Sequence, residues 1–349
     1  MPLLRRQDDI ATLAKQSFLL GERSLRAYAA GGNVRFLQDA EANLSVIGPT
    51  DRNYGRAQFY LGVALTQLRK TTKSVEIFRG LQKAKGTLPT PLDANFQNQV
   101  ALQLAYAQIK TYTQQGYDGA EGELLRLHDI AVAKEQNKVL LVQTLSLQAF
   151  LYAVKAGRDQ NEPARPQYAR RAFDVADKLL MSPVINAEAR FEALNALGIT
   201  WMRVGEGTGL PKDDAIGQAW RKEFPLETDA WQKAEGAFAR ALLVVPNSVR
   251  VLQNIATMKL LQFDRDKKNP ERARFLKEGK EALLLSLDVN DQDQFPYYRL
   301  AEFAVREEDR EGASTFIRLG KSRPGAVKEK EWIRVEAAAA ALSQSEATT

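Results

Sequence analysis

One spacing recurs along the chain: a small residue is followed four residues later by a large apolar one, and three residues after that by another small or apolar residue. It is clearest at Ala234, Phe238 and Ala241. The same spacing begins at Ala169, Ser74, Ala120, Gly279 and Ala313. Steps of four and three place side chains on one face of an α-helix. Its repetition predicts an array of helices in which small residues admit the large residues of their neighbours.

A matching helix precedes several of these segments. Leu61 and Gly62 lie thirteen and twelve residues before Ser74, and a leucine–alanine pair lies at the same distances before Ala313. With this pairing the chain resembles the tetratricopeptide repeat family, whose unit is an antiparallel helix pair of about 34 residues. The resemblance covers most of residues 55–325 and implies a right-handed α-solenoid.

Composition and proline positions agree with an all-α fold. Alanine and leucine dominate, and β-branched residues form no long alternating runs, so strands find little support. The thirteen prolines stand mostly at junctions, because proline cannot continue a helix from inside. About seven helix pairs fit between these stops. They fall roughly at 17–48, 55–88, 92–131, 137–182, 187–247, 249–288 and 294–325.

We expect three regions along the chain. Residues 1–54 would hold N-terminal helices of a degenerate repeat, and residues 55–325 would hold the solenoid. Residues 326–349 would form a capping helix and a disordered tail, because the last repeat of a solenoid otherwise exposes an apolar face.

An insertion at residues 204–230 interrupts the fifth pair. It opens with three glycines, for which we expect a flexible loop. Its Trp220 and Phe224 either fold back onto the helices or contribute to a partner site, since loops on scaffolds often carry function.

The net charge of +6 is concentrated in residues 51–100, which contain eight basic and three acidic side chains. The basic residues around the second helix pair are Arg69, Lys70, Lys73, Arg79, Lys83 and Lys85. They form either a solvated outer face or a docking patch for an acidic partner or a phosphate backbone. A dedicated nucleic-acid binder would carry basic residues along several repeats. This chain does not, so the sequence disfavours nucleic acid as a partner.

Few residues could support catalysis. The chain has no cysteine and one histidine, His128, which excludes a metal site built from those residues. A catalytic triad would need a serine positioned against His128, and no nucleophile-elbow sequence occurs. The carboxylates of residues 307–311 are better explained as a solvated turn. The glycines of residues 205–209 lack the preceding strand and the Gly-Lys-Ser/Thr ending of a phosphate loop. The sequence therefore predicts no enzymatic activity, no cofactor and no metal.

The N-terminal residues lack the apolar core of a signal peptide, and no uncharged run of 18 apolar residues is evident. The absence of cysteine also fits a reducing compartment. We therefore expect a cytoplasmic chain without membrane insertion.

The family resemblance implies a ligand site on the concave face, which the first helix of each pair lines. Mapped onto this chain, that face would present Arg56, Phe59, Tyr60, Asn195, Arg203, Asn254, Tyr298 and Arg299. Such aromatic, amide and guanidinium groups can hold an extended peptide or a partner helix. Some family members clamp a C-terminal carboxylate with lysine, asparagine and arginine. Only Asn254 and Arg299 match that clamp here, so none is expected.

The sequence favours a non-catalytic scaffold or adaptor that binds a partner protein or peptide on the concave face. The alternative is a regulatory or sensor subunit that contacts nucleic acid through the basic patch at residues 69–85. A third interpretation is an enzyme that uses carboxylates on the concave face. The sequence does not identify the partner, the pathway or the oligomeric state.

Overall fold

The computed structural model describes residues 2–31, 33–84, 86–133, 137–157, 162–225, 229–265, 269–323, 327 and 329–346. This part of the chain contains sixteen helices and no strand, so the fold is all-α as predicted. The chain divides into two compact units, Met1–Leu151 and Tyr152–Thr349, and their boundary falls within one helix.

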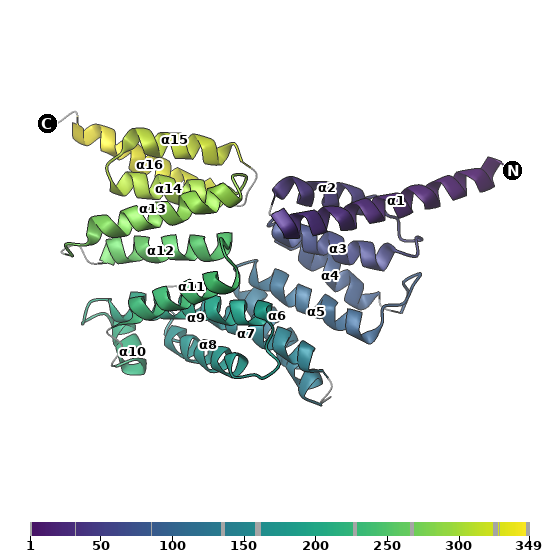
Figure 1. Cartoon of the computed structure of the whole chain (residues 1–349), viewed down its shortest axis with the longest axis horizontal. Coiled ribbons are helices and arrows are strands. Elements are labelled where there is room, and N and C mark those ends of the chain that lie inside the picture. Colours follow the sequence, from purple (N-terminus) through teal and green to yellow (C-terminus); the bar gives the residue numbers. More distant parts are fainter. Residues whose placement is uncertain are drawn as a thin grey trace. The chain divides into compact units, whose positions relative to one another are not determined.

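Unit 1 consists of helices that pack in consecutive pairs. It contains α1 (Pro2–Gly31), α2 (Val34–Ser45), α3 (Tyr54–Gln67), α4 (Thr71–Lys83), α5 (Ala94–Ile109), α6 (Gln114–Ala133) and most of α7 (Lys138–Ala156) (Figure 1). The pairs are α1 with α2, α3 with α4, and α5 with α6. The first helices α1 and α3 also contact the next first helix, and α2 and α4 contact the helices that follow them. This repeated packing is that of a helical-repeat fold.

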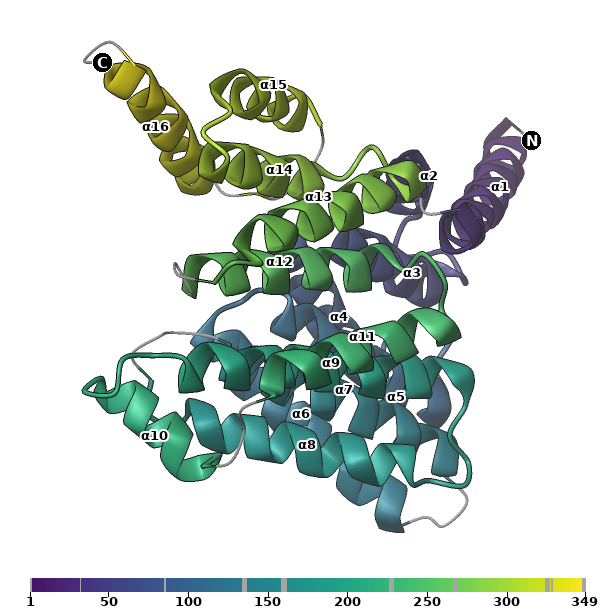
Figure 2. The ribbon, with the colours of Figure 1, turned by 60° about the vertical axis from the view of Figure 1, so that its left-hand side comes forward.

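Unit 2 continues the same packing after the last residues of α7. It contains α8 (Arg165–Leu180), α9 (Ala187–Thr208), α10 (Ala215–Glu223), α11 (Ala230–Val244), α12 (Val249–Arg265), α13 (Arg272–Val289), α14 (Gln294–Arg306), α15 (Arg310–Lys321) and α16 (Glu329–Glu346). The pairs are α9 with α11, α12 with α13, and α14 with α15. The last helix, α16, contacts both α14 and α15 (Figure 2), so it occupies the position of a next first helix.

The recurring small and large residues form the contact between the helices of a pair. Phe238 of α11 is fully buried, and its ring fills the space where Gly198 of α9 has no side chain. Phe78 of α4 covers Gly62 of α3 in the same way. Ala234, one turn before Phe238, is also fully buried. The prediction that small residues admit large ones from neighbouring helices is confirmed.

The insertion between α9 and α11 differs in part from its prediction. Helix α9 extends to Thr208, so Gly205 and Gly207 lie in a helix and not in a loop, and Gly209 is the C-cap of that helix. The reason is packing: Gly207 leaves room for the ring of Trp220 against the helix backbone. Trp220 is fully buried and Phe224 is nearly so, which confirms that the insertion folds back onto the helices. Helix α10 accordingly contacts α8 and α9.

One described helix, α7, is long and apolar enough to cross a membrane by length and composition alone, with a mean hydropathy of 1.5. Lys155 interrupts its apolar run, so the sequence contains no uncharged run of 18 apolar residues here and did not predict a membrane-spanning helix. However, 67% of its apolar window is buried inside the protein, which is the pattern of a core helix.

Candidate functional site

The basic residues singled out in the sequence lie on and just before α4. This helix is amphipathic: Val75 and Phe78 are buried on its inner side, while Lys73, Arg79 and Lys83 are exposed on the opposite side. Lys83 stands in the last turn, where the helix dipole stabilises a positive charge. We call the side formed by Lys73, Glu76, Arg79 and Lys83 the outer face of α4.

The basic residues on and just before α4 differ in whether they already form an ion pair. Lys70 forms an ion pair with Glu41 of α2, with 2.5 Å between its Nζ and the Oε2 of the carboxylate. Within the part of the chain that the structure describes, Lys73, Arg79 and Lys83 form no ion pair or hydrogen bond through their side chains. They are therefore available to an anionic ligand.

Three other residues complete the description of the basic patch. Arg69 is exposed in the turn before α4, where its φ of 60° lies in the left-handed region. Glu76 is the acidic member of the outer face of α4, and it forms no ion pair with the described residues. Lys85 lies outside the described residues.

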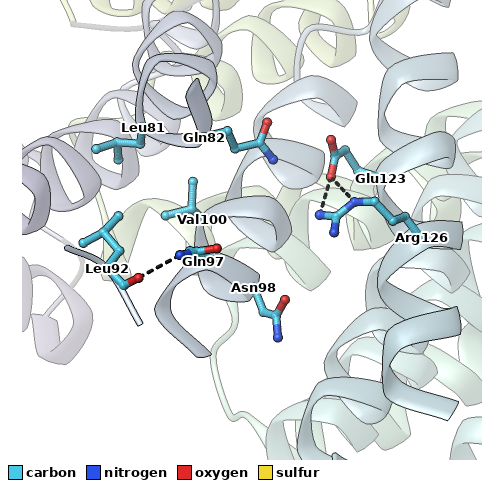
Figure 3. Close-up of a pocket in the computed structure, with 8 residues that line it drawn as sticks. All are labelled: Leu81, Gln82, Leu92, Gln97, Asn98, Val100, Glu123 and Arg126. Carbon is cyan, nitrogen blue, oxygen red and sulfur yellow. Dashed lines mark hydrogen bonds and ion pairs between the residues drawn. The ribbon is translucent and has the colours of Figure 1, made fainter. Parts of the chain in front are cut away.

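A pocket of about 280 Å³ opens next to the C-terminal half of α4. It is lined by Leu81, Gln82, Leu92, Gln97, Asn98, Val100, Glu123 and Arg126 (Figure 3). These residues come from α4, α5, α6 and the segment before α5, so three helices of unit 1 build the pocket. The apolar members are buried and form its walls, whereas the amides are half-buried.

The polar groups of the pocket are only partly satisfied. Gln97 donates from Nε2 to the carbonyl of Leu92 at 2.7 Å, which leaves its Oε1 open. Arg126 donates to Oε2 of Glu123 from Nε at 3.3 Å and from a terminal nitrogen at 2.9 Å. Asn98 forms no side-chain hydrogen bond with any described residue. The pocket can therefore form hydrogen bonds with a polar ligand.

This pocket was not predicted from the sequence. The signal that could have indicated it is the run of amides at the start of α5, Asn95, Gln97, Asn98 and Gln99. The predicted ligand site lies on the first helices, whereas α4 and α6, which help to line the pocket, are the second helices of their pairs.

The residues predicted to line a concave face do not form one exposed surface. Arg56 is exposed, and Phe59 and Tyr60 are half-buried within an aromatic cluster. The ring of Phe59 packs against that of Phe96 of α5 at a tilt of 56°, with the centroids 4.8 Å apart. Phe59 and Tyr60 therefore contribute to the core of unit 1.

Tyr298 was placed in the groove by the sequence, and this placement is wrong. The side chain is 4% exposed and lies in a core cluster with Trp332 of α16. Its hydroxyl group donates to Oε1 of Glu302 at 3.0 Å. The physical reason is that α16 packs on the side of α14 where the first helix of a further repeat would pack. Arg299, the next residue, is half-buried and ion-paired with Glu302 at 2.5 Å.

Asn195 was also expected to be accessible, but it is fully buried. Its Oδ1 accepts a hydrogen bond at 2.9 Å from Nδ2 of Asn254, which is half-buried on α12. This hydrogen bond joins the neighbouring first helices α9 and α12 and pairs the buried Oδ1 of Asn195. The resemblance to tetratricopeptide repeats therefore placed Asn195 in the groove, whereas its side chain lies between helices.

Arg203 belongs to a buried ion cluster. Its terminal nitrogen lies 2.9 Å from Oε2 of Glu206, a carboxylate that also lies 3.5 Å from Arg165 and 3.9 Å from Arg265. The Arg203 side chain packs over Gly157 at the end of α7. The Glu206 carboxylate contacts Arg165 of α8 and Arg265 of α12 as well as Arg203 of its own helix, so Arg203 is part of the interior of unit 2 and does not face a groove.

The described residues contain no group of three or more acidic, histidine or cysteine side chains placed to hold a metal ion. His128 is more than a third exposed, and its Nδ1 lies 3.7 Å from Oδ1 of the exposed Asp129. Glu307, Glu308 and Asp309 lie in the exposed turn before α15, and Glu311 lies exposed in its first turn. Asp309 caps the helix by accepting from the Gly312 amide at 2.8 Å.

No protein-family model and no curated protein sequence matches the chain. Two similar solved structures are a human IFIT1 dimer with PPP-AAAA and a monomeric mutant of IFIT1 with Gppp-AAAA. The first has a TM-score of 0.39 and 12% sequence identity, and the match covers 93% of this chain and 74% of that chain. The second has a TM-score of 0.39 and 10% identity, and it covers 93% and 75%.

These structures correct two expectations from the sequence. The sequence favoured a protein scaffold and disfavoured nucleic acid, whereas both similar proteins are bound to RNA. The scaffold interpretation took a helical-repeat architecture as a sign of a protein ligand, and these two structures contradict that step because both hold RNA. A TM-score of 0.39 assigns no ligand to this chain, and the function proposed below rests on its own residues.

Proposed function

We propose that this chain binds nucleic acid through the outer face of α4, as a non-catalytic regulatory or sensor component of the cytoplasm. The observation that supports the proposal is the set of three exposed cations, Lys73, Arg79 and Lys83, that no described residue neutralises. A cation that already has an ion pair offers little to a new ligand. An unpaired cation can replace a counterion on a phosphate backbone, and the released counterion favours binding.

The spacing of the cations fits a chain of phosphates. Lys73 and Lys83 are separated by ten residues, which is about 15 Å along a helix axis at 1.5 Å per residue. A duplex strand presents one phosphate per about 3.4 Å of its axis, so about four phosphates face this length. The outer face of α4 is therefore long enough to hold three phosphates at once.

The test is the binding of short fluorescently labelled RNA, measured by anisotropy over a series of salt concentrations. Three phosphate contacts to a single strand give a slope of log K against log salt of about −2, at roughly −0.7 for each contact. The triple variant Lys73→Glu, Arg79→Glu and Lys83→Glu should lose binding. Its three positions are exposed, so its helical circular dichroism should match the wild type.

A second triple variant controls for the change in total charge. Lys178→Glu, Arg240→Glu and Lys277→Glu alter exposed residues of unit 2 and change the net charge by the same amount. This control should bind RNA like the wild type. Equal loss in both variants, or no RNA binding by the wild type near physiological salt, would refute the proposal.

A further inference from the structure

The pocket of unit 1 lies beside the cations of α4. Gln82, which lines the pocket, follows Arg79 by three residues and precedes Lys83 by one. Residues three apart are neighbours on a helix surface, so Arg79 stands at the edge of the pocket. A strand whose phosphates contact Arg79 and Lys83 therefore has its bases within reach of the pocket.

The lining of the pocket has the donors and acceptors that recognise base edges. Gln82 and Asn98 make no side-chain hydrogen bond with any described residue, and Gln97 keeps its Oε1 open. Asparagine and glutamine amides pair with bases by donating and accepting at once. The side chain of Gln82 extends toward Glu123 on the other side of the pocket, whereas the amide nitrogen of Gln97 points to Leu92 (Figure 3).

The remaining lining suits a flat ring. Leu81, Leu92 and Val100 offer buried apolar walls for the face of a base. The guanidinium of Arg126 is half exposed and held by Glu123, and such planes stack on unpaired bases. A volume of about 280 Å³ lies below the range of about 300–1,000 Å³ that larger ligands occupy. The pocket therefore suits a single ring system better than a folded segment of protein.

We infer that this pocket binds one unpaired nucleobase of a single-stranded nucleic acid whose phosphates lie along the outer face of α4. The inference rests on the proposed function and adds the class of ligand to it. A duplex hides its base edges in pairs and stacks, whereas a single strand can turn a base outward. The cations would then set affinity, and the amides would set preference among bases.

The experiment compares labelled homopolymers of adenylate, cytidylate, guanylate and uridylate, the matching DNA strands, and a duplex. Wild-type protein should prefer one homopolymer by about tenfold, the order of discrimination that an amide–base pair supplies. It should also bind single strands more tightly than the duplex. The double variant Gln82→Ala and Asn98→Ala should lose the preference, while the salt dependence of binding stays unchanged.

The matched control is Gln38→Ala with Gln67→Ala, which removes two exposed amides of unit 1 outside the pocket. It should retain the wild-type preference, and circular dichroism should show all variants folded. The same preference among DNA strands would support recognition of the base alone. A preference confined to RNA would support RNA as the ligand.

Other outcomes overturn the inference in distinguishable ways. Salt-dependent binding with equal affinity for all homopolymers and the duplex overturns the base pocket and leaves the proposed function standing. A preference that survives the double variant also overturns the pocket. Failure of the wild type to bind any probe overturns both proposals.

Discussion

At the scale of single residues, Tyr298 shows how burial changes the chemistry of a side chain. Its ring meets Trp332 edge to face, with centroids 5.5 Å apart. Burial raises the pKa of Tyr298 to about 12, because the phenolate would lose its hydration, and the charge of Glu302 adds to this effect. The folded protein therefore keeps this phenol neutral at pH values where an exposed tyrosine ionises.

This shift predicts a pH dependence of stability. The folded pKa of about 12 lies above the ordinary value of 10.0, so the folded state holds the proton more tightly. The contribution is fully present below pH 10 and is lost as pH rises through about 12. We expect Tyr298→Phe, which cannot ionise, to lose stability less steeply over this interval, measured by urea unfolding at each pH.

Tyr112 supplies the control for alkaline unfolding, because its side chain is 52% exposed. Tyr112→Phe should follow the wild-type curve between pH 10 and 12. Parallel curves for the wild type and Tyr298→Phe would contradict a buried, neutral phenol at position 298.

At the scale of elements, the contact between α9 and α11 depends on the small residues of α11. Ala234 is fully buried one turn before Phe238, whereas Ala239 of the same helix is exposed. We expect Ala234→Arg to destabilise unit 2 by about 3–5 kcal/mol, because it forces a charged chain between packed helices. Ala239→Arg makes the same change in the same helix and should shift stability by less than about 0.5 kcal/mol.

Denaturation followed by tryptophan fluorescence measures both variants. Similar midpoints for Ala234→Arg and Ala239→Arg would show that the pair contact does not depend on this alanine.

The helices could be predicted from the sequence because their signals are local. The step of four and three, with prolines at junctions, places α11 and its neighbours close to where the structure has them. The burial of Tyr298 could not be predicted, because it depends on α16 packing against α14. The continuation of α9 through its glycines depends in the same way on Trp220, which packs against Gly207.

Only part of the candidate site could be predicted from the sequence. The excess of positive charge in residues 51–100 identified α4 directly. The pairing of Lys70 with Glu41 could not be read from the sequence, because 29 positions separate the two residues. The pocket joins α4, α5 and α6, so its lining is a product of tertiary packing.

At the scale of the whole molecule, the unfolding of the two units can be followed separately by tryptophan fluorescence and circular dichroism. The four tryptophans, at positions 201, 220, 231 and 332, all belong to unit 2. Tryptophan fluorescence therefore reports on unit 2, whereas far-ultraviolet circular dichroism reports on the helices of both units. In helical repeats stability is approximately a sum of nearest-neighbour terms, so damage in one region stays local.

Ala64→Arg inserts a charge at a fully buried position of α3. We expect unit 1 of this variant to unfold at a lower denaturant concentration, so that part of the circular dichroism signal is lost earlier than in the wild type. The fluorescence transition should stay in place, because α3 belongs to unit 1. Gln67→Arg, at an exposed position of the same helix, should change neither signal. A joint shift of both signals in Ala64→Arg would show that the units unfold as one.

The glycines of the helix contacts also determine which inherited changes the chain can tolerate. At Gly62, Gly198 and Gly279 a ring from another helix already fills the space of a Cβ. Glycine is the smallest residue, so every missense change at these codons adds atoms where none fit. Gly80 and Gly122 face open space, and alanine there would favour the helix. Natural variants of this chain should therefore accumulate at the second set of codons and be absent from the first.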